Sequence, residues 1–233
     1  MRLQKIAVIM LLMNCCGWAG IMANSSFENP DVSGMLCGVS GLNGCAYQPV
    51  TANWAFTGSS GIASDVDPSN PFNLGSTADG TQTGFIQWDT ANPASHPGSI
   101  SQTLTGLVFG QSYVVSFQAA QRPDTLSPTG AFLFGGEQDF DVLWNDSVIG
   151  YFFPTSTSFS GYVTSFTATA STGTLAFLAV DTLLGDRTAF IDDVHVDAET
   201  VPEPSNGLMV LFAIGLIGLG LSRKLISSRQ LPS

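Results

Sequence analysis

The sequence has few basic residues, and this scarcity limits the partners that the protein can have. It carries 7 Lys and Arg against 18 Asp and Glu, a net charge of −11 over 233 residues. Five of the seven basic residues lie near the two ends, so the region 24–200 keeps only Arg122 and Arg187 against 17 acids. Nucleic acids and anionic membrane surfaces attract basic surfaces. The sequence therefore excludes them as partners of this region and favours neutral sugars or divalent cations.

Histidine is also scarce, and the usual catalytic patterns are missing. The two histidines are His96, in a Pro-flanked segment, and His195, within an expected strand. The sequence has no G-x-S-x-G elbow for a nucleophile and no His or Cys cluster for zinc. Asp139, Asp141 and Asp146 lie close in sequence, but acids are so abundant that their spacing does not indicate a glycosidase pair. We expect no enzyme activity.

Only four cysteines occur, in two pairs. Cys15 and Cys16 lie in the N-terminal apolar region, where Asn14 stands in place of the small residue that a lipidation site requires. Cys37 and Cys45 lie in a Gly-rich segment with no further Cys or His nearby, which argues against a metal site. In an exported protein such a pair predicts a disulfide.

The C-terminal apolar run is short. Leu208 to Leu221 spans 14 residues, or about 21 Å as a helix at about 1.5 Å per residue, whereas a bilayer core is about 30 Å thick. Before this run, the two prolines of the segment 201–204 favour extended backbone. After it, Arg223 and Lys224 form a basic cluster that favours the cytoplasmic side.

This order of Pro-Glu-Pro, short apolar helix and basic cluster resembles the PEP-CTERM sorting signal, which exosortases of Gram-negative bacteria process. The resemblance implies a sorting segment over 201–233 with a transmembrane helix at about 207–222, and an exosortase-type enzyme as partner. It also implies export across the inner membrane, at least transient anchoring there, and a place at the cell surface, outer membrane or extracellular (biofilm) matrix. The implied sorting residues are Val201, Pro202, Glu203, Pro204, Arg223 and Lys224. An ordinary C-terminal membrane anchor is the alternative.

The N-terminus has the pattern of a secretory signal peptide over residues 1–23. Arg2 and Lys5 precede the apolar stretch 6–13, and small residues follow it. We expect cleavage after Ala23, with cleavage after Ala19 as the alternative.

The residues between the two signals predict a single all-β domain over 24–200. Seven segments are rich in β-branched and aromatic residues and bounded by turn residues. These are 83–88, 99–104, 111–120, 137–144, 161–170, 174–180 and 188–196. One more strand is expected at 54–56 within long ordered loops over 34–73. The spacing favours an antiparallel sandwich, and a domain of this length closes a substantial core.

Two motifs open and close this domain. They are Asn24–Glu28 (NSSFE) and Phe190–Val194 (FIDDV), and their order resembles the galactose-binding-like jelly-roll group, which includes carbohydrate-binding modules and DUF642-like proteins. The resemblance implies a jelly-roll sandwich with a structural Ca²⁺ held by Glu28 and by Asp192 or Asp193, with backbone carbonyls completing the oxygen shell. Solvated strand-end charges are the alternative. Alternation along the strand places Asp192 on the face of Phe190 and Val194.

Aromatic side chains beside polar groups are the natural candidates for sugar binding. The candidates are Tyr47, Trp88, Trp144 and Tyr151. Trp144 is expected in the core, as is Trp54, whereas Trp88 ends a strand beside a loop and is the preferred platform. We expect a non-catalytic surface or matrix protein that binds exopolysaccharide. A structural or adhesive protein with protein partners is the alternative, and a glycan hydrolase is less favoured.

Overall fold

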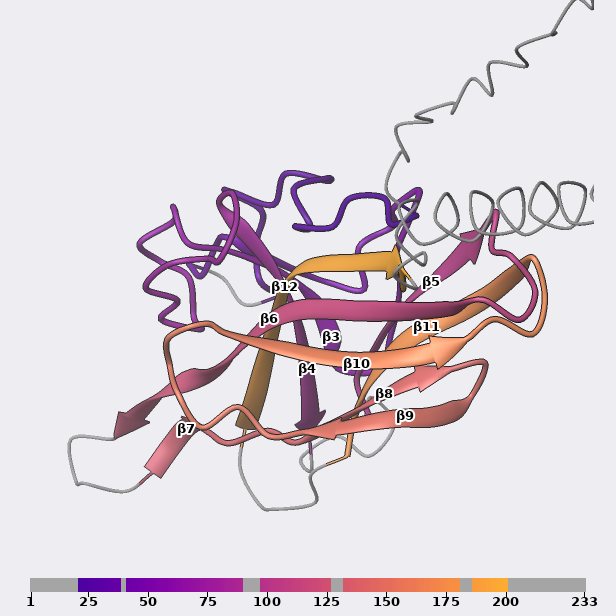
Figure 1. Ribbon diagram of the computed structural model, residues 1–233. Coiled ribbons are helices and arrows are strands. Elements are labelled where there is room, and N and C mark those ends of the chain that lie inside the picture. Colours follow the sequence, from indigo (N-terminus) through magenta and orange to yellow (C-terminus); the bar gives the residue numbers. More distant parts are fainter. Residues whose placement is uncertain (1–20, 39–40, 90–96, 127–131, 181–185, 201–233) are drawn as a thin grey trace, which may run out of the picture. The chain divides into compact units, whose positions relative to one another are not determined.

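The computed structural model describes residues 21–38, 41–89, 97–126, 132–180 and 186–200 (Figure 1). The compact unit ends at Ala198, and the chain from Glu199 onward forms a separate unit. Most of the expected signal peptide, His96 and the sorting segment from Val201 lie outside the described residues. Among the described residues, no helix has the length and apolarity needed to cross a membrane; the helix expected at about 207–222 is not among them.

The described residues form twelve strands in two sheets. The strands are β1 (Cys45–Tyr47), β2 (Ala55–Thr57), β3 (Ser60–Ser64), β4 (Gln82–Asp89), β5 (Ser99–Thr105), β6 (Ser112–Leu126), β7 (Phe132–Gly136), β8 (Phe140–Trp144), β9 (Ser147–Phe152), β10 (Ser160–Thr167), β11 (Thr172–Ala179) and β12 (Asp186–Ala198). One sheet has the order β1-β3-β4-β12-β7-β6-β10, with β12 also paired to β6, and the other has the order β2-β5-β11-β8-β9. All pairings are antiparallel except a single one between β12 and β7. The predicted all-β antiparallel jelly-roll sandwich is confirmed.

The main core lies between the two sheets. Strand alternation supplies it: on β11, for example, Leu175, Phe177 and Ala179 are fully buried and the residues between them are not. Both tryptophans expected in the core lie there, Trp54 at 2% and Trp144 at 6% exposure. Burying each large apolar side chain contributes about 1.5–3 kcal/mol, so this layer supplies much of the stability of the fold.

A second core covers the outer face of the seven-stranded sheet. It contains Phe72, Phe85, Phe190, Ala63 and Ala120 together with both cysteines of the 37–45 pair. The Gly- and Ser-rich region before β4 therefore folds as an ordered cover. Strand β3 is buried along its whole length, because its sheet is covered on both faces.

Cys37 and Cys45 form the predicted disulfide within this cover, with their Cα atoms 5.0 Å apart and both residues buried. On the chain-entropy account, closing so short a loop stabilises by about 2–3 kcal/mol. We expect the Cys37→Ser/Cys45→Ser double variant to lower the free energy of unfolding by that amount in denaturant titrations. Reduction should lower the midpoint of the wild type and leave the variant unchanged; equal midpoints under oxidising conditions would contradict the prediction.

Candidate functional site

The carboxylate of Glu28 fastens the opening segment of the domain to the start of β4. It accepts hydrogen bonds from the backbone N–H of Thr81 and of Gln82, both at 2.8 Å, and from the Thr81 hydroxyl at 3.1 Å. Gln82 also bonds back to the opening segment, because its side-chain amide donates to the carbonyl of Phe27 at 2.8 Å. Glu28 therefore accepts hydrogen bonds from the backbone of two consecutive residues, Thr81 and Gln82, where β4 begins.

Asp192 occupies a fully buried position near this contact, on the closing strand β12. It accepts the backbone N–H groups of Ala78 at 2.8 Å, Asp79 at 3.0 Å and Asp193 at 2.8 Å. Burial raises the pKa of Asp192 to about 7, outweighing the N–H donors that lower it. The Ser26 hydroxyl donates to Asp79 at 2.6 Å, so the opening segment also contacts the loop that caps Asp192.

A β-bulge follows Asp192 and corrects one prediction. The pairing of β12 with β6 shifts register between Asp192 and His195, and Asp193 has φ of 49°. Phe190 lies in the second core, while Val194 lies in the main core. The prediction that Asp192 shares a face with both Phe190 and Val194 is thus wrong for Val194, because a bulge adds one residue and reverses the alternation.

The residues proposed to bind calcium fit that ion poorly in this arrangement. The oxygens of Glu28 and Asp192 face N–H and O–H donors, and Asp193 Oδ1 lies 2.6 Å from Nε2 of the exposed His195. Among the described residues, no group of three or more His, Cys, Asp or Glu side chains is placed to hold a metal ion. Calcium at Glu28 with Asp192 or Asp193 stays a prediction.

The aromatic candidates separate by exposure. Trp144 is buried and stacks on Phe166 with ring centroids 3.9 Å apart. Trp88, the preferred platform, is partly buried against the main core, and its backbone N–H donates to Gln138 at 2.7 Å. Tyr47 is 46% exposed on the seven-stranded sheet. Tyr151 is 53% exposed on β9, an edge strand of the five-stranded sheet.

Strand register places Tyr151 at the end of a row of side chains that crosses the five-stranded sheet. Tyr151 pairs with Asp141, Asp141 with Leu178, Leu178 with Ser99, and Ser99 with Thr57. Their neighbours along each strand include the buried core residues, so this row faces outward. Along the row, hydroxyl groups lie at the end formed by Thr57 and Ser99, and the apolar Leu178 lies in the middle. The acidic Asp141 and the aromatic Tyr151 form the other end, called the aromatic end.

A second row runs beside the first on the same face. It consists of Ala55, Ser101, Ala176, Leu143 and Val148. These are small or apolar side chains, and none is charged. Together these ten residues of the two rows form the sheet face.

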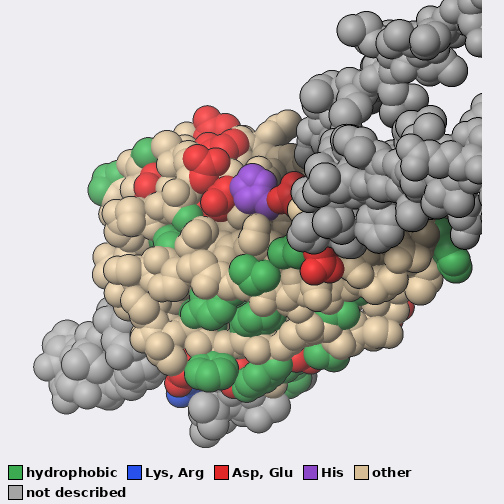
Figure 2. Space-filling view, in the orientation of Figure 1, with side chains coloured by type: hydrophobic (Ala, Val, Ile, Leu, Met, Phe, Trp, Pro, Cys, Tyr) green, Lys and Arg blue, Asp and Glu red, His purple; other side chains and the backbone are tan. Residues whose placement is uncertain are grey.

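The aromatic end of the sheet face continues into an exposed apolar strip. Phe153 is 54% exposed, and its ring lies 6.2 Å from that of Tyr151. Val148 is also more than half exposed. Val163 is exposed on the outward face of β10, in the other sheet, and Figure 2 shows apolar side chains at the surface over β10 and β9. The Tyr151 hydroxyl donates to Asp139, while desolvation raises the pKa of Asp141.

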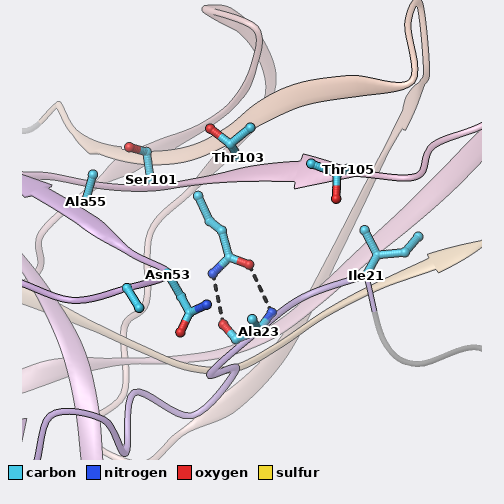
Figure 3. A pocket seen from close by; sticks show the side chains of 9 residues that line it. Ile21, Ala23, Asn53, Ala55, Ser101, Thr103 and Thr105 are labelled. Carbon is cyan, nitrogen blue, oxygen red and sulfur yellow. Dashed lines mark hydrogen bonds between the residues drawn. The ribbon is translucent and has the colours of Figure 1, made fainter.

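The other end of the sheet face opens into a cavity of about 400 Å³ (Figure 3). It lies where β2 no longer pairs with β5, and its polar lining consists of amides and hydroxyls from Asn53, Ser101, Gln102, Thr103 and Thr105. Small apolar residues complete the wall: Ile21, Ala23, Ala52 and Ala55. Among the residues that the structure describes, none with an ionisable side chain lines it. Neither this cavity nor the role of Gln102 could be predicted from strand patterns.

Both basic residues of the domain donate hydrogen bonds to backbone carbonyls. Arg122 is 3% exposed, donates to the carbonyl of Pro71 at 2.5 Å and lies 4.9 Å from the ring centroid of Phe72. Arg187 donates to the carbonyl of Glu137 at 3.0 Å. The sheet face therefore presents carboxylate and neutral groups.

Comparison with solved structures supports the fold. A Stig cyclase, Fisc, from Fischerella sp. TAU is 14% identical, covers 77% of this chain and 96% of its own, and has a TM-score of 0.52. The CBM22-1 xylan-binding domain from Paenibacillus barcinonensis Xyn10C is 10% identical over 67% of this chain and 93% of its own, with a TM-score of 0.42. TmCBM61, solved with β-1,4-galactotriose, is 10% identical over 77% of this chain and 99% of its own, with a TM-score of 0.41. At such identities the cyclase likeness shows the fold alone, and the two lower scores carry no further argument.

The C-terminal resemblance is confirmed. None of the curated proteins matches the sequence significantly. The family model described as the PEP-CTERM protein-sorting motif, however, matches residues 200–224, which contain all six predicted sorting residues. Residues 200–224 are therefore a PEP-CTERM sorting motif, the mark of an exported protein processed at the membrane, and they follow a jelly-roll domain.

Proposed function

We propose that the jelly-roll domain is a non-catalytic module that binds a neutral extracellular polysaccharide on the sheet face. The observation that carries the proposal is the continuity of this face, from the hydroxyl- and amide-lined cavity to the exposed ring of Tyr151. Sugar rings pack on aromatic and small apolar side chains, and hydroxyl and amide groups fix their orientation. The two rows offer both kinds of contact across five strands.

Charge favours a neutral glycan. Asp139 and Asp141 lie at the aromatic end, and Arg122 and Arg187 donate to backbone carbonyls. An acidic polysaccharide would meet repulsion from these carboxylates. The hydroxyl groups of a neutral chain, by contrast, can donate to these carboxylates. Export through the sorting route would bring the domain to such polysaccharides.

Binding of the domain to a panel of neutral and acidic polysaccharides, with calcium and with chelator, tests this proposal. We expect saturable binding to a neutral glycan, weakened about tenfold or more by Tyr151→Ala, which corresponds to about 1.4 kcal/mol. Phe109→Ala is the matched control, because Phe109 is 78% exposed in the segment between β5 and β6 and belongs neither to the sheet face nor to the cavity lining. It should leave the affinity unchanged.

The same panel separates the alternatives. If Trp88→Ala abolishes binding with the fold intact and Tyr151→Ala does not, the platform lies at the end of β4, as predicted from the sequence. If a folded domain binds no polysaccharide, the proposal fails and a structural or adhesive role with protein partners is favoured. Release of shortened glycan would show a hydrolase.

A further inference from the structure

Ile21–Ala23 is built into the domain, although its sequence pattern first assigned it to the signal peptide. Ala23 donates its N–H to Oε1 of Gln102 at 2.9 Å, and Nε2 of Gln102 donates to the Ala23 carbonyl at 2.9 Å (Figure 3). Gln102 is only 5% exposed. Its amide thus takes the place of a neighbouring strand and holds both polar groups of one backbone residue.

The two residues before Ala23 also contribute to the folded domain. Ile21 and Met22 are partly buried against the main core. Ile21 and Ala23 form part of the wall of the cavity at the end of the sheet face. The segment therefore supplies apolar contact, a paired hydrogen bond and one side of the candidate site.

Cleavage after Ala23 would remove all three contributions. The Gln102 amide would lose both partners, and a buried polar group without partners costs about 1–3 kcal/mol. The new N-terminal ammonium would stand at Asn24, whose carbonyl accepts the Trp54 indole N–H at 2.8 Å. A charge would thus be placed beside the core.

We propose that the signal peptidase cleaves after Ala19, so that the mature chain begins at Gly20 and keeps Ile21–Ala23 as a wall of the cavity. The sequence around each bond agrees. Gly17 and Ala19 give the small residues expected three and one positions before a cleavage site, whereas cleavage after Ala23 would place Ile21 at the first of these positions. The proposal rests on export and is independent of glycan binding.

Identifying the N-terminal residue of the exported protein tests the proposed cleavage site. The full chain would be expressed in a Gram-negative host, and the exported form digested with a protease that cleaves after Glu, because Glu28 is the first acid. Mass spectrometry should find the N-terminal peptide Gly20–Glu28. The peptide Asn24–Glu28 would overturn the proposal, and an uncut leader would overturn both the proposal and the expected export.

A double-mutant comparison tests the structural role separately. Domains that start at Gly20 or at Asn24, both ending at Thr200, would be melted with and without Gln102→Ala. We expect the longer domain to unfold at a temperature higher by about 2–12 °C, and Gln102→Ala to remove most of that difference. Equal midpoints for the two starting points would show that the segment contributes nothing and would contradict the proposal.

Discussion

Replacing Phe27 with alanine should lower the free energy of unfolding by about 3–5 kcal/mol, the usual cost of deleting a buried phenylalanine ring. Phe27 is fully buried, and its ring stacks on Trp54 at 4.9 Å between centroids and meets Phe56 edge-on at 6.5 Å. A Cβ added at Gly84 would lie 2.9 Å from this ring. The ring therefore fills a space that β4 leaves for it, and its loss opens a cavity between the sheets.

The backbone around Phe27 increases the expected effect. Phe27 has φ of 59°, in the left-handed region that residues other than glycine rarely adopt. Its N–H donates to the Asn24 carbonyl at 3.2 Å, and its own carbonyl accepts from Gln82. Without the ring, less packing remains to hold this turn in place.

Thermal and denaturant unfolding measure the change directly. For a domain of 150–250 residues, about 2–4 °C is lost per kcal/mol, so the midpoint should fall by at least about 6 °C. Phe109→Ala serves as control, because its exposed ring should cost little when removed. A midpoint within a degree or two of wild type would contradict the role assigned to the opening segment.

The opening motif also shows how far the sequence could predict the structure. The seven expected strands correspond to β4, β5, β6, β8, β10, β11 and β12, since buried strands with alternating or continuous apolar residues leave a clear pattern. The expected strand at 54–56 corresponds to β2. The burial of Trp54 and Trp144 was predicted correctly, because large apolar side chains favour the core. The disulfide of the cysteine pair was predicted correctly, because exported proteins form disulfides.

The strands that the sequence did not predict are those where local residues and tertiary environment disagree. Asn145 and Asp146 both have positive φ and form the tight turn of a β8–β9 hairpin. Ser147 and Gly150, whose residue types are typical of turns, belong instead to β9. Strand β3 (SGIAS) has small residues around Ile62 and no alternation of buried and exposed positions, because both of its faces are covered.

The sheet face was not predictable from spacing. It depends on which strands are neighbours and in which register, and the register joins Thr57 to Tyr151 across almost a hundred residues of sequence. Tyr151 was among the aromatic candidates but could not be preferred over Trp88, whose partial burial only the fold reveals. Gln102 carried no signal, because its partner is a backbone group.

Asp192→Ala should be the second strongly destabilising change. We expect it to lower the free energy of unfolding by about 3 kcal/mol at pH 5. The substitution removes the acceptor of three backbone N–H groups, and each net hydrogen bond contributes about 0.5–1.5 kcal/mol. It also disconnects the loop at Ala78 and Asp79 from the closing strand. Asp197→Ala is the matched control, because Asp197 lies exposed on the same strand.

The destabilisation caused by Asp192→Ala should become smaller as the pH rises. The pKa of Asp192 is raised from 3.8 to about 7 by burial, so between these values the folded protein binds more protons than the unfolded chain. The stability that this group contributes is therefore complete below about pH 4 and falls as the pH rises through about 7, by about 1.4 kcal/mol per pH unit within the window. Because alanine does not titrate, the gap between wild type and Asp192→Ala should be larger at pH 5 than at pH 8.

The same measurement addresses calcium. A Ca²⁺ ion held by Asp192 would keep its carboxylate ionised, so the gap would grow with pH in the presence of calcium. EGTA would then lower the unfolding midpoint of wild type and leave Asp192→Ala unchanged. If the backbone donors alone hold Asp192, the midpoint is the same in EGTA and in calcium, and the gap narrows as the pH rises. Opposite pH slopes thus distinguish a carboxylate that coordinates a cation from one that only fastens the two ends of the domain.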